Sequence, residues 1–180
     1  MIHIRRFADV AHREDVREAI DKIFFDNAAT PHFFDEPSRR LYHELWLQRY
    51  LRHFPESCWV AIDEDHNGDI VGYLAGSLVS DSAPLPGPDY YRLFPANFVE
   101  KFPAHIHVSV RSGWHNQGIG RLLINAFRTH CREKQMAGFH AVTVANRCPA
   151  HFFTHCGMEV QARVIWHESQ IVFIAEKLDP

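Results

Sequence analysis

The chain has 180 residues, a length that suits a single domain with a substantial hydrophobic core. Its hydrophobic fraction of 46% is ordinary for a globular protein, and its net charge of −3 lacks the basic excess that nucleic-acid binding requires. The sequence shows neither an N-terminal apolar segment nor a run of about 18 apolar residues, so we expect no signal peptide, membrane span or membrane partner.

Apolar spacing and turn residues predict the order β-α-α-β-β-β-α-β-α-β-β in one domain, residues 1–180, with no internal repeat. Asp9 is the predicted cap of the first helix, and Pro55 ends the second. The predicted strands cover residues 2–7, 58–62, 70–80, 104–110, 139–144, 159–166 and 170–177. The predicted helices cover residues 10–25, 38–53, 119–131 and 149–156, with a further short helix near 96–101.

The segment from Val108 to Leu123 combines the end of a strand, a turn with Gly118 and Gly120, and the start of a helix. A helix start leaves four backbone N–H groups without partners, and the helix dipole adds partial positive charge there. Glycine lets a ligand approach this backbone closely, so the segment predicts a phosphate or diphosphate site. It matches neither a P-loop nor the dinucleotide turn, and a tight packing contact between helix and sheet is the alternative.

Three segments carry a resemblance to a known family: Val110–Gly120, Asn146–Met158 and the hairpin Trp59–Gly76. In these motifs and in element order, nearly the whole chain resembles the GNAT acetyltransferase superfamily. His115 stands where the family's turn usually has Arg or Gln, while Asn146 and Gly157 have the family's spacing. Within the superfamily, the chain looks closest to the acetyltransferase-like domain of O-GlcNAcases and its stand-alone bacterial relatives, in Asp63–Asp65 with Gly72–Tyr73, Phe94–Phe98 and Phe102–His107.

The resemblance implies an α/β (α+β) fold with a mixed, twisted sheet of about seven strands and about four helices, splayed between the fourth and fifth strands. It also implies acetyl-CoA as co-substrate, with pantetheine along the fourth strand and the diphosphate on the amides of the turn. Arg111 or Arg121 could add charge to a phosphate, although a solvated surface arginine is an equal alternative for each. The implied cofactor-binding residues are Val108, Ser109, Val110, His115, Asn116, Gln117, Gly118, Ile119, Gly120, Arg121, Asn146, Phe152 and Phe153.

The activity implied is N-acetyltransfer to a primary amine, on a small molecule or a lysine side chain, by direct transfer in a ternary complex. His107 and, less strongly, His105 are candidate general bases, because they share one face of the fourth strand and an imidazole titrates near neutral pH. Structural histidines of the sheet are the alternative. Four residues of loops expected to border the acceptor are candidate substrate contacts: His32, Asp35, Tyr90 and Tyr91.

Phe153 is the main departure from the family, which often has Tyr at this position to protonate the departing thiolate. Thr154, His151 or His155 could replace it, or water could. Ala104 stands where some family members place a carboxylate base. These departures leave open a catalytically weak or inactive acyl-CoA-binding or protein-interaction domain, but the intact glycine turn favours a working enzyme.

Cys148, His151, His155 and Cys156 suggest a metal site, but their segment overlaps the family motif and lacks a zinc signature, so we expect no metal. The four cysteines form no C-x-x-C pair, which favours free thiols in a reducing cytoplasm. Exposed edge strands in the final hairpin would allow a homodimer.

Overall fold

The computed structural model describes residues 1–28, 35–80, 89–145 and 148–179. The chain divides into two compact units. The first contains residues 1–76 and 107–127, and the second contains residues 77–106 and 128–180. Strand β4 (Ala104–Val110) and helix α6 (Ile119–Glu133) contribute residues to both units.

The strands of the described residues follow the order β1-β2-β3-β4-β5-β7-β6 in one mixed sheet. Pairing is antiparallel within β1-β2-β3 and within β5-β7-β6. It is parallel between β4 and β5, where Ala104 pairs with Phe139 and His105 with His140. The predicted mixed sheet is therefore confirmed, and its strands are close to the predicted ranges. The remaining strands are β1 (Ile2–Arg6), β2 (Trp59–Asp63), β3 (Asp69–Ser77), β5 (Gly138–Val144), β6 (Glu159–Trp166) and β7 (Ser169–Lys177).

The helices of the first unit are more divided than the sequence predicts. A single helix over 10–25 is wrong: α1 (Phe7–Val10) and α2 (Glu14–Asp26) are separated by a turn, and Asp9 lies inside α1 instead of capping it. The helix begins three residues early, at Phe7, whose side chain is completely buried. The predicted helix 38–53 begins at Glu36 and contains a π-helical turn. Its parts are α3 (Glu36–His43), η1 (Glu44–Gln48) and α4 (Arg49–His53), followed by the 3-10 turns η2 (Pro55–Ser57) and η3 (Glu64–His66).

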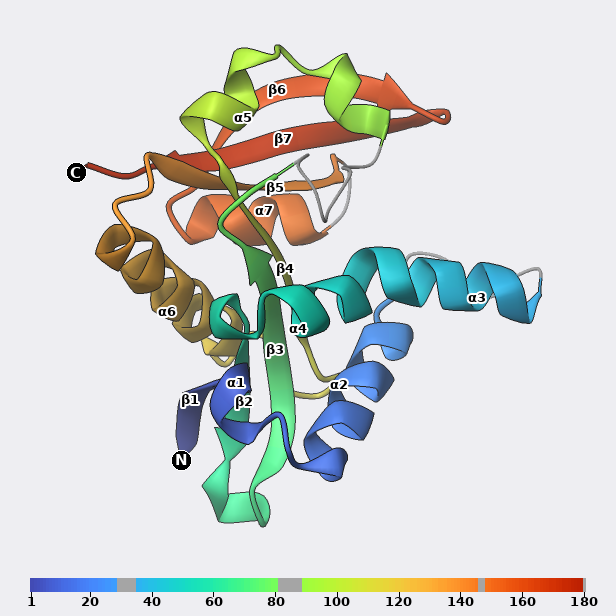
Figure 1. Ribbon diagram of the computed structural model, residues 1–180, viewed down its shortest axis with the longest axis vertical. Coiled ribbons are helices and arrows are strands. Elements are labelled where there is room, and N and C mark those ends of the chain that lie inside the picture. Colours follow the sequence, from blue (N-terminus) through green and yellow to red (C-terminus); the bar gives the residue numbers. More distant parts are fainter. Residues whose placement is uncertain (29–34, 81–88, 146–147, 180) are drawn as a thin grey trace. The chain divides into compact units, whose positions relative to one another are not determined.

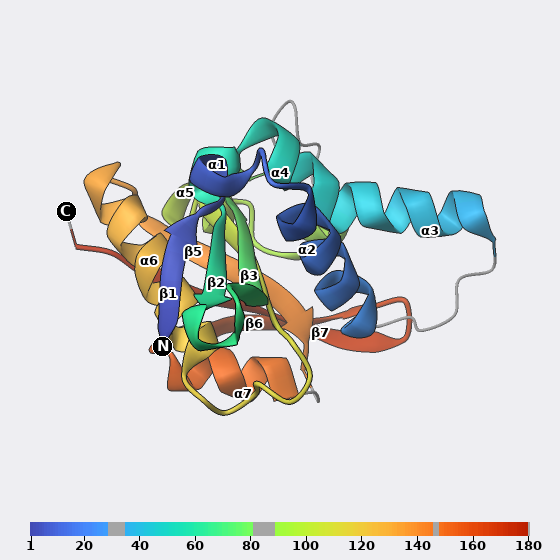
Figure 2. The same ribbon diagram turned by 90° about the horizontal axis from the view of Figure 1, so that it is seen from below.

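Different helices pack on the two faces of the sheet in the first unit. A Cβ added to Gly72 would lie 3.2 Å from Ile119, and one added to Gly76 would lie 2.5 Å from the Phe127 ring, so these glycines let α6 approach closely. Tyr73 alternates with them and points to the opposite face. Figure 2 shows α1, α2 and α4 along one side of β1, β2 and β3.

The second unit also packs helices on both faces of its strands, β5, β7 and β6. Figure 1 shows α5 (Asn97–Lys101) and α7 (Cys148–His155) on opposite sides of β5 and β7. Val172 packs with Ala145 and Ala150 on the α7 side. Its neighbour Phe173 points the other way and is surrounded by aromatic rings. These rings belong to Phe94, which follows the 3-10 helix η4 (Asp89–Leu93), and to Phe98 and Phe102.

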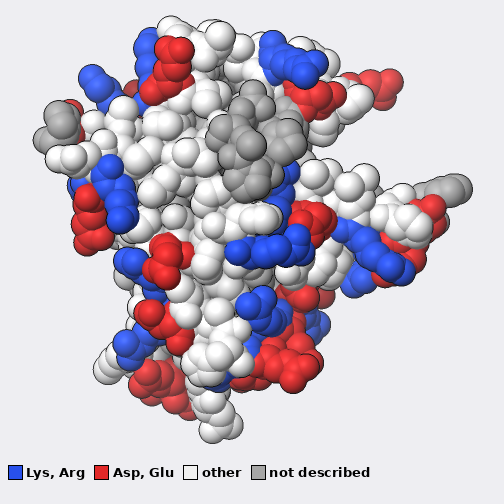
Figure 3. Space-filling model, viewed as in Figure 1, with Lys and Arg blue, Asp and Glu red and all other residues white. Residues whose placement is uncertain are grey.

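Charges are mixed on the face of the molecule that Figure 3 shows. On the face drawn in Figure 3, basic and acidic side chains are interspersed and do not form an extended patch of one sign. None of the helices in the described part of the chain is both long and apolar enough to span a bilayer.

Candidate active site

The glycine turn begins where β4 ends. The Arg111 N–H donates to the Val71 carbonyl at 2.8 Å, and the Trp114 N–H donates to the Arg111 carbonyl at 3.0 Å. Three residues of the turn have left-handed backbones, Gly113, Asn116 and Gly118, with φ values of 86°, 62° and 80°. Glycine therefore suits the first and last of these positions, because a Cβ is disfavoured in this conformation.

Side chains of the turn hold its own backbone in place. His115 Nε2 donates to the Val110 carbonyl at 2.9 Å, and Gln117 Nε2 donates to the Gly113 carbonyl at 3.2 Å. Asn27 at the end of α2 donates to the same Val110 carbonyl at 3.3 Å. The predicted cofactor residues His115 and Gln117 thus use these nitrogens to shape the turn.

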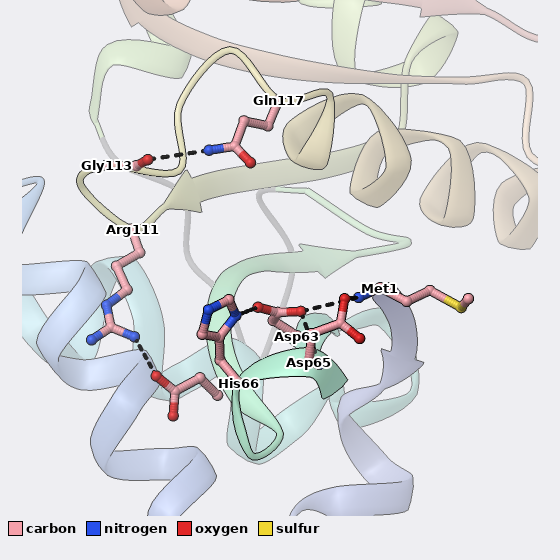
Figure 4. A network of polar contacts seen from close by, with 8 residues as sticks. Met1, Asp63, Asp65, His66, Arg111, Gly113 and Gln117 are labelled. Carbon is pink, nitrogen blue, oxygen red and sulfur yellow. Dashed lines mark hydrogen bonds and ion pairs between the residues drawn. The ribbon is translucent and has the colours of Figure 1, made fainter.

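The neighbouring β2–β3 hairpin supports the turn from one side (Figure 4). Asp63 accepts a hydrogen bond from His66 Nδ1, and the His66 ring contacts the Trp114 ring edge to face, with centroids 5.9 Å apart. Arg111 forms an ion pair with Asp69 at 2.9 Å. In Figure 4, Arg111 points away from Gln117, which gives its guanidinium a structural partner on the hairpin.

Helix α6 begins directly after Gly118. The first helical hydrogen bond joins the Leu122 N–H to the Gly118 carbonyl at 3.0 Å. The N–H groups of residues 119–121 therefore precede the first intrahelical bond, as at any helix start. A Cβ added to Gly118 would meet no atom within 4 Å, so open space lies beside these amides. This space and the donors fit an anionic group such as a diphosphate.

Alternation along β4 separates its side chains into two sets. Ile106, Val108 and Val110 share one face, while His105, His107 and Ser109 share the other. Val108 and Val110 lie on the face that α6 covers in the first unit, where a Cβ added to Gly72 would lie 3.2 Å from both the Ser109 carbonyl oxygen and Ile119. In the first unit, His107 is consequently on the face covered by α2–α4.

His107 lies among aromatic side chains of η1 and α4. Its Nε2 is 3.3 Å from the Tyr50 hydroxyl, and its ring contacts Trp46 edge to face at 5.3 Å. Burial, and then the positive charge of Arg49, lower the pKa of His107 to about 4. Moving a proton to it from an amine of pKa about 10.4 would cost about 9 kcal/mol. This environment favours a neutral, hydrogen-bonding imidazole over a general base.

His105 belongs to a buried cluster in the second unit. It is 3% exposed and stacks on His140, with ring centroids 4.9 Å apart. His140 Nδ1 donates to the Phe102 carbonyl at 2.7 Å, so its Nε2 accepts from the Tyr91 hydroxyl, also at 2.7 Å. Tyr90 is 2% exposed and contacts Trp166 edge to face. Burial and stacking favour a structural role for His105, and they place Tyr90 and Tyr91 in the interior of this unit.

Asp35 caps helix α3. Its carboxylate accepts a hydrogen bond from the Ser38 N–H at 2.8 Å. Hydrogen bonds from the Ser38 side chain and then its backbone lower the pKa of Asp35. The candidate residues His32 and Asn146 lie outside the described residues.

A model of the Acetyltransferase (GNAT) family matches residues 14–158, a range that contains the glycine turn and residues of both units. The chain belongs to the GNAT acetyltransferase family. A search of curated protein sequences finds no match.

Solved structures share this GNAT fold over nearly their whole length. SsHAT has a TM-score of 0.71 at 21% identity, with 98% of each chain covered. The NatC complex bound to Gag peptide and CoA has a TM-score of 0.70 at 15% identity, with 99% of each chain covered. The yncA protein of Salmonella typhimurium, with its cofactor acetyl-CoA, has a TM-score of 0.62 at 19% identity, covering 100% of this chain and 95% of the other. At these identities, the likeness shows the fold alone.

In the GNAT motif that ends at Gly157, Phe153 is 5% exposed and has no hydroxyl to donate. Gly157 has a φ of 94°, so a glycine is needed where the chain leaves α7. The alternative donors point back to their own helix, because Thr154 Oγ1 and His155 Nδ1 both donate to the His151 carbonyl. No group of three or more His, Cys, Asp or Glu side chains that could hold a metal ion is found in the described residues.

A polar cluster that the sequence did not predict lies on the α2–α4 face of the first unit. Asp21 Oδ1 accepts hydrogen bonds from His43 Nε2 at 2.8 Å and from Gln48 Nε2 at 3.1 Å. Tyr73 lies close by, where burial raises its pKa and its hydroxyl is in hydrogen-bonding reach of the Ser109 side chain. The sequence held little signal for this cluster, because the residues come from separate elements.

Proposed function

We propose that this GNAT protein transfers an acetyl group from acetyl-CoA to a primary amine, on a small molecule or a lysine side chain, in a ternary complex. The observation that carries the proposal is the open, amide-lined start of α6 directly after β4. The CoA and acetyl-CoA in two of the similar structures support the choice of co-substrate.

The residues of the turn would hold the diphosphate through backbone amides. The N–H groups of residues 119–121 supply donors, and Gly118 leaves room for the anion beside them. His115 and Gln117 keep this backbone in one conformation through bonds to the Val110 and Gly113 carbonyls. The bound co-substrate supplies an acyl carbon that is activated as a thioester.

The chain then has two tasks in the transfer. It must hold the amine against the acyl carbon, and such positioning can contribute about 7–11 kcal/mol. It must also accept a proton, since a lysine-type amine with a pKa of about 10.4 is charged at neutral pH. The lowered pKa of His107 makes it a poor acceptor for that proton.

A second candidate function is acyl-CoA binding without efficient turnover. Phe153 favours it, because a phenyl ring cannot protonate the departing thiolate. Coenzyme A thiolate can leave without an enzymic acid, so this residue alone does not exclude catalysis.

The experiment that separates the two functions is release of free thiol from acetyl-CoA with a panel of small amines and lysine peptides. We expect acetyl-CoA-dependent release with at least one amine, and an increase of several-fold in kcat for Phe153→Tyr. Binding of acetyl-CoA without thiol release across the panel, in both proteins, would support the binding domain instead.

A further inference from the structure

The π-helical turn η1 brings together two side chains that an α-helix would separate. His43 and Gln48 are five residues apart, which is the hydrogen-bonding interval of a π-helix. Both donate to the same carboxylate oxygen of Asp21, on α2. Single π-turns are rare and are frequently found at functional sites. The π-turn therefore allows His43 to pair with Asp21 while Gln48 holds the Asp21 carboxylate in place.

These hydrogen bonds define the state of the His43 ring. Nε2 lies 2.8 Å from a carboxylate oxygen, so it carries the proton and donates it. In the neutral ring, Nδ1 then has a free lone pair. No hydrogen bond to Nδ1 is recorded in the described part of the chain, and the side chain is 20% exposed. The rings of Phe24 and Phe25, 5.4 and 5.0 Å away, restrict its orientation.

The pair lies on the face of the sheet that carries Ser109 and His107. Tyr73 of β3 connects the two places: its hydroxyl is in reach of Ser109, and the charges of Asp21 and Tyr42 act on its pKa. Ser109 directly precedes Val110, whose carbonyl is bonded to the glycine turn. Helix α2, which carries Asp21, reaches the end of β4, because Asn27 at its C-terminus donates to the Val110 carbonyl at 3.3 Å. The cluster therefore lies on a helix that contacts the end of β4, where the proposed reaction needs a proton acceptor.

Neighbouring charge distinguishes His43 from His107. A protonated His43 would face the Asp21 carboxylate at 2.8 Å, whereas a protonated His107 would face the positive charge of Arg49. Tyr42 and Arg39 lie on the same helix α3, and Tyr73 of β3 is within electrostatic reach of Asp21 and Tyr42. Of these, Arg39 lies over the Phe25 ring, 3.8 Å from its centroid, and also pairs with Glu36. Asp21 bonds the imidazole directly, and Gln48 Nε2 also lies 3.1 Å from the imidazole Nε2.

We propose that His43 is the general base that takes the proton from the acceptor amine, and that Asp21 and Gln48 are its positioning residues. The inference rests on the proposed amine acetylation. Nδ1 takes one proton from the ammonium group, which frees the nitrogen lone pair. That nitrogen forms a bond to the acyl carbon and the C–S bond breaks. The amide nitrogen then loses its second surplus proton to the thiolate, and the imidazolium returns its proton to water.

The test compares pH profiles of kcat/KM for the most active amine of the panel. His43→Gln is expected to lower kcat/KM by about 10²–10⁴-fold and to remove the acidic limb of the profile. Asp21→Asn keeps the shape of the side chain but removes its charge, so we expect a smaller loss and an acidic limb shifted to lower pH. His53→Gln, an exposed histidine at the end of α4, is the matched control and should behave as wild type.

Acetyl-CoA affinity, measured by calorimetry, should be unchanged in all three variants, which also shows that each variant is folded. If the wild type is active and His43→Gln has the same pH profile of kcat/KM, this inference is wrong while the proposed function stands. If His43→Gln misfolds, an Asp21→Asn profile identical to wild type overturns it. A wild type that binds acetyl-CoA but acetylates no amine overturns the proposed function and this inference together.

Discussion

Two histidines on one face of the first unit differ in the charge beside them. His107 packs under Tyr50 and Trp46 near Arg49, and His43 is bonded to Asp21. An imidazole that must become charged during a reaction is stabilised by the carboxylate and destabilised by the guanidinium. Its position on β4 made His107 the predicted base. The charged group beside each ring, however, decides how readily that imidazole accepts a proton.

The lowered pKa of His107 predicts an acid-dependent loss of stability. Between pH 6.5 and 4 the unfolded chain binds a proton at this residue and the folded chain does not, so stability falls as the pH falls. From pH 7 to pH 5 this single group contributes about 2 kcal/mol of loss. Urea unfolding at both pH values should show that His107→Gln loses about 2 kcal/mol less than wild type. Equal losses in the two proteins would contradict the buried, neutral state.

The glycine positions could be predicted at the residue level, whereas the histidine roles could not. Gly118 and Gly157 each have a positive φ, and sequence alone marked both through the motif. The roles of His105 and His107 depend on rings from α4, η4 and β5, which are distant in the chain. Their alternation on β4 predicted a shared face correctly but carried no information about which side chains cover it.

Helix α3, the turn η1 and helix α4 show what can be predicted at the scale of elements. Apolar spacing located the helical stretch within two residues of its start. It did not reveal the π-turn, because one extra residue in a turn changes the apolar pattern very little. The division between α1 and α2 was also not predicted. Helix α1 begins at the buried Phe7, two residues before the expected cap at Asp9.

The N-cap residue Asp35 allows a test of helix α3 alone. Asp35→Ala removes the acceptor for the Ser38 N–H and should fray the first turn of α3. We expect lower helicity by circular dichroism and a Tm lower by about 2–4 °C. Asp35→Asn retains a capping oxygen and should restore both values without changing the KM for the amine. A higher KM in Asp35→Asn would instead support the predicted contact of this carboxylate with the substrate.

At the scale of the whole molecule, the family match covers residues of both units, because residues 14–158 include parts of each. A single domain over residues 1–180 stays a prediction, as does the homodimer. Strand β6 is one edge of the sheet and alternates exposed and half-buried residues. A bulge between Val160 and Ala162, with Gln161 as the extra residue, interrupts its pairing with β7. Bulges of this kind discourage edge-to-edge association.

The amides that open α6 are the core of the proposed co-substrate site, and calorimetry of acetyl-CoA binding tests them directly. Gly118 and Gly68 have φ values of 80° and 78°, so a valine at either position strains the backbone to a similar degree. Only Gly118 lies beside the proposed diphosphate site. We predict heat of binding in wild type and in Gly68→Val, and an affinity at least about ten-fold weaker in Gly118→Val. If the wild type shows no heat of binding, or if Gly118→Val binds acetyl-CoA as tightly as wild type, the proposed diphosphate site at the start of α6 is wrong.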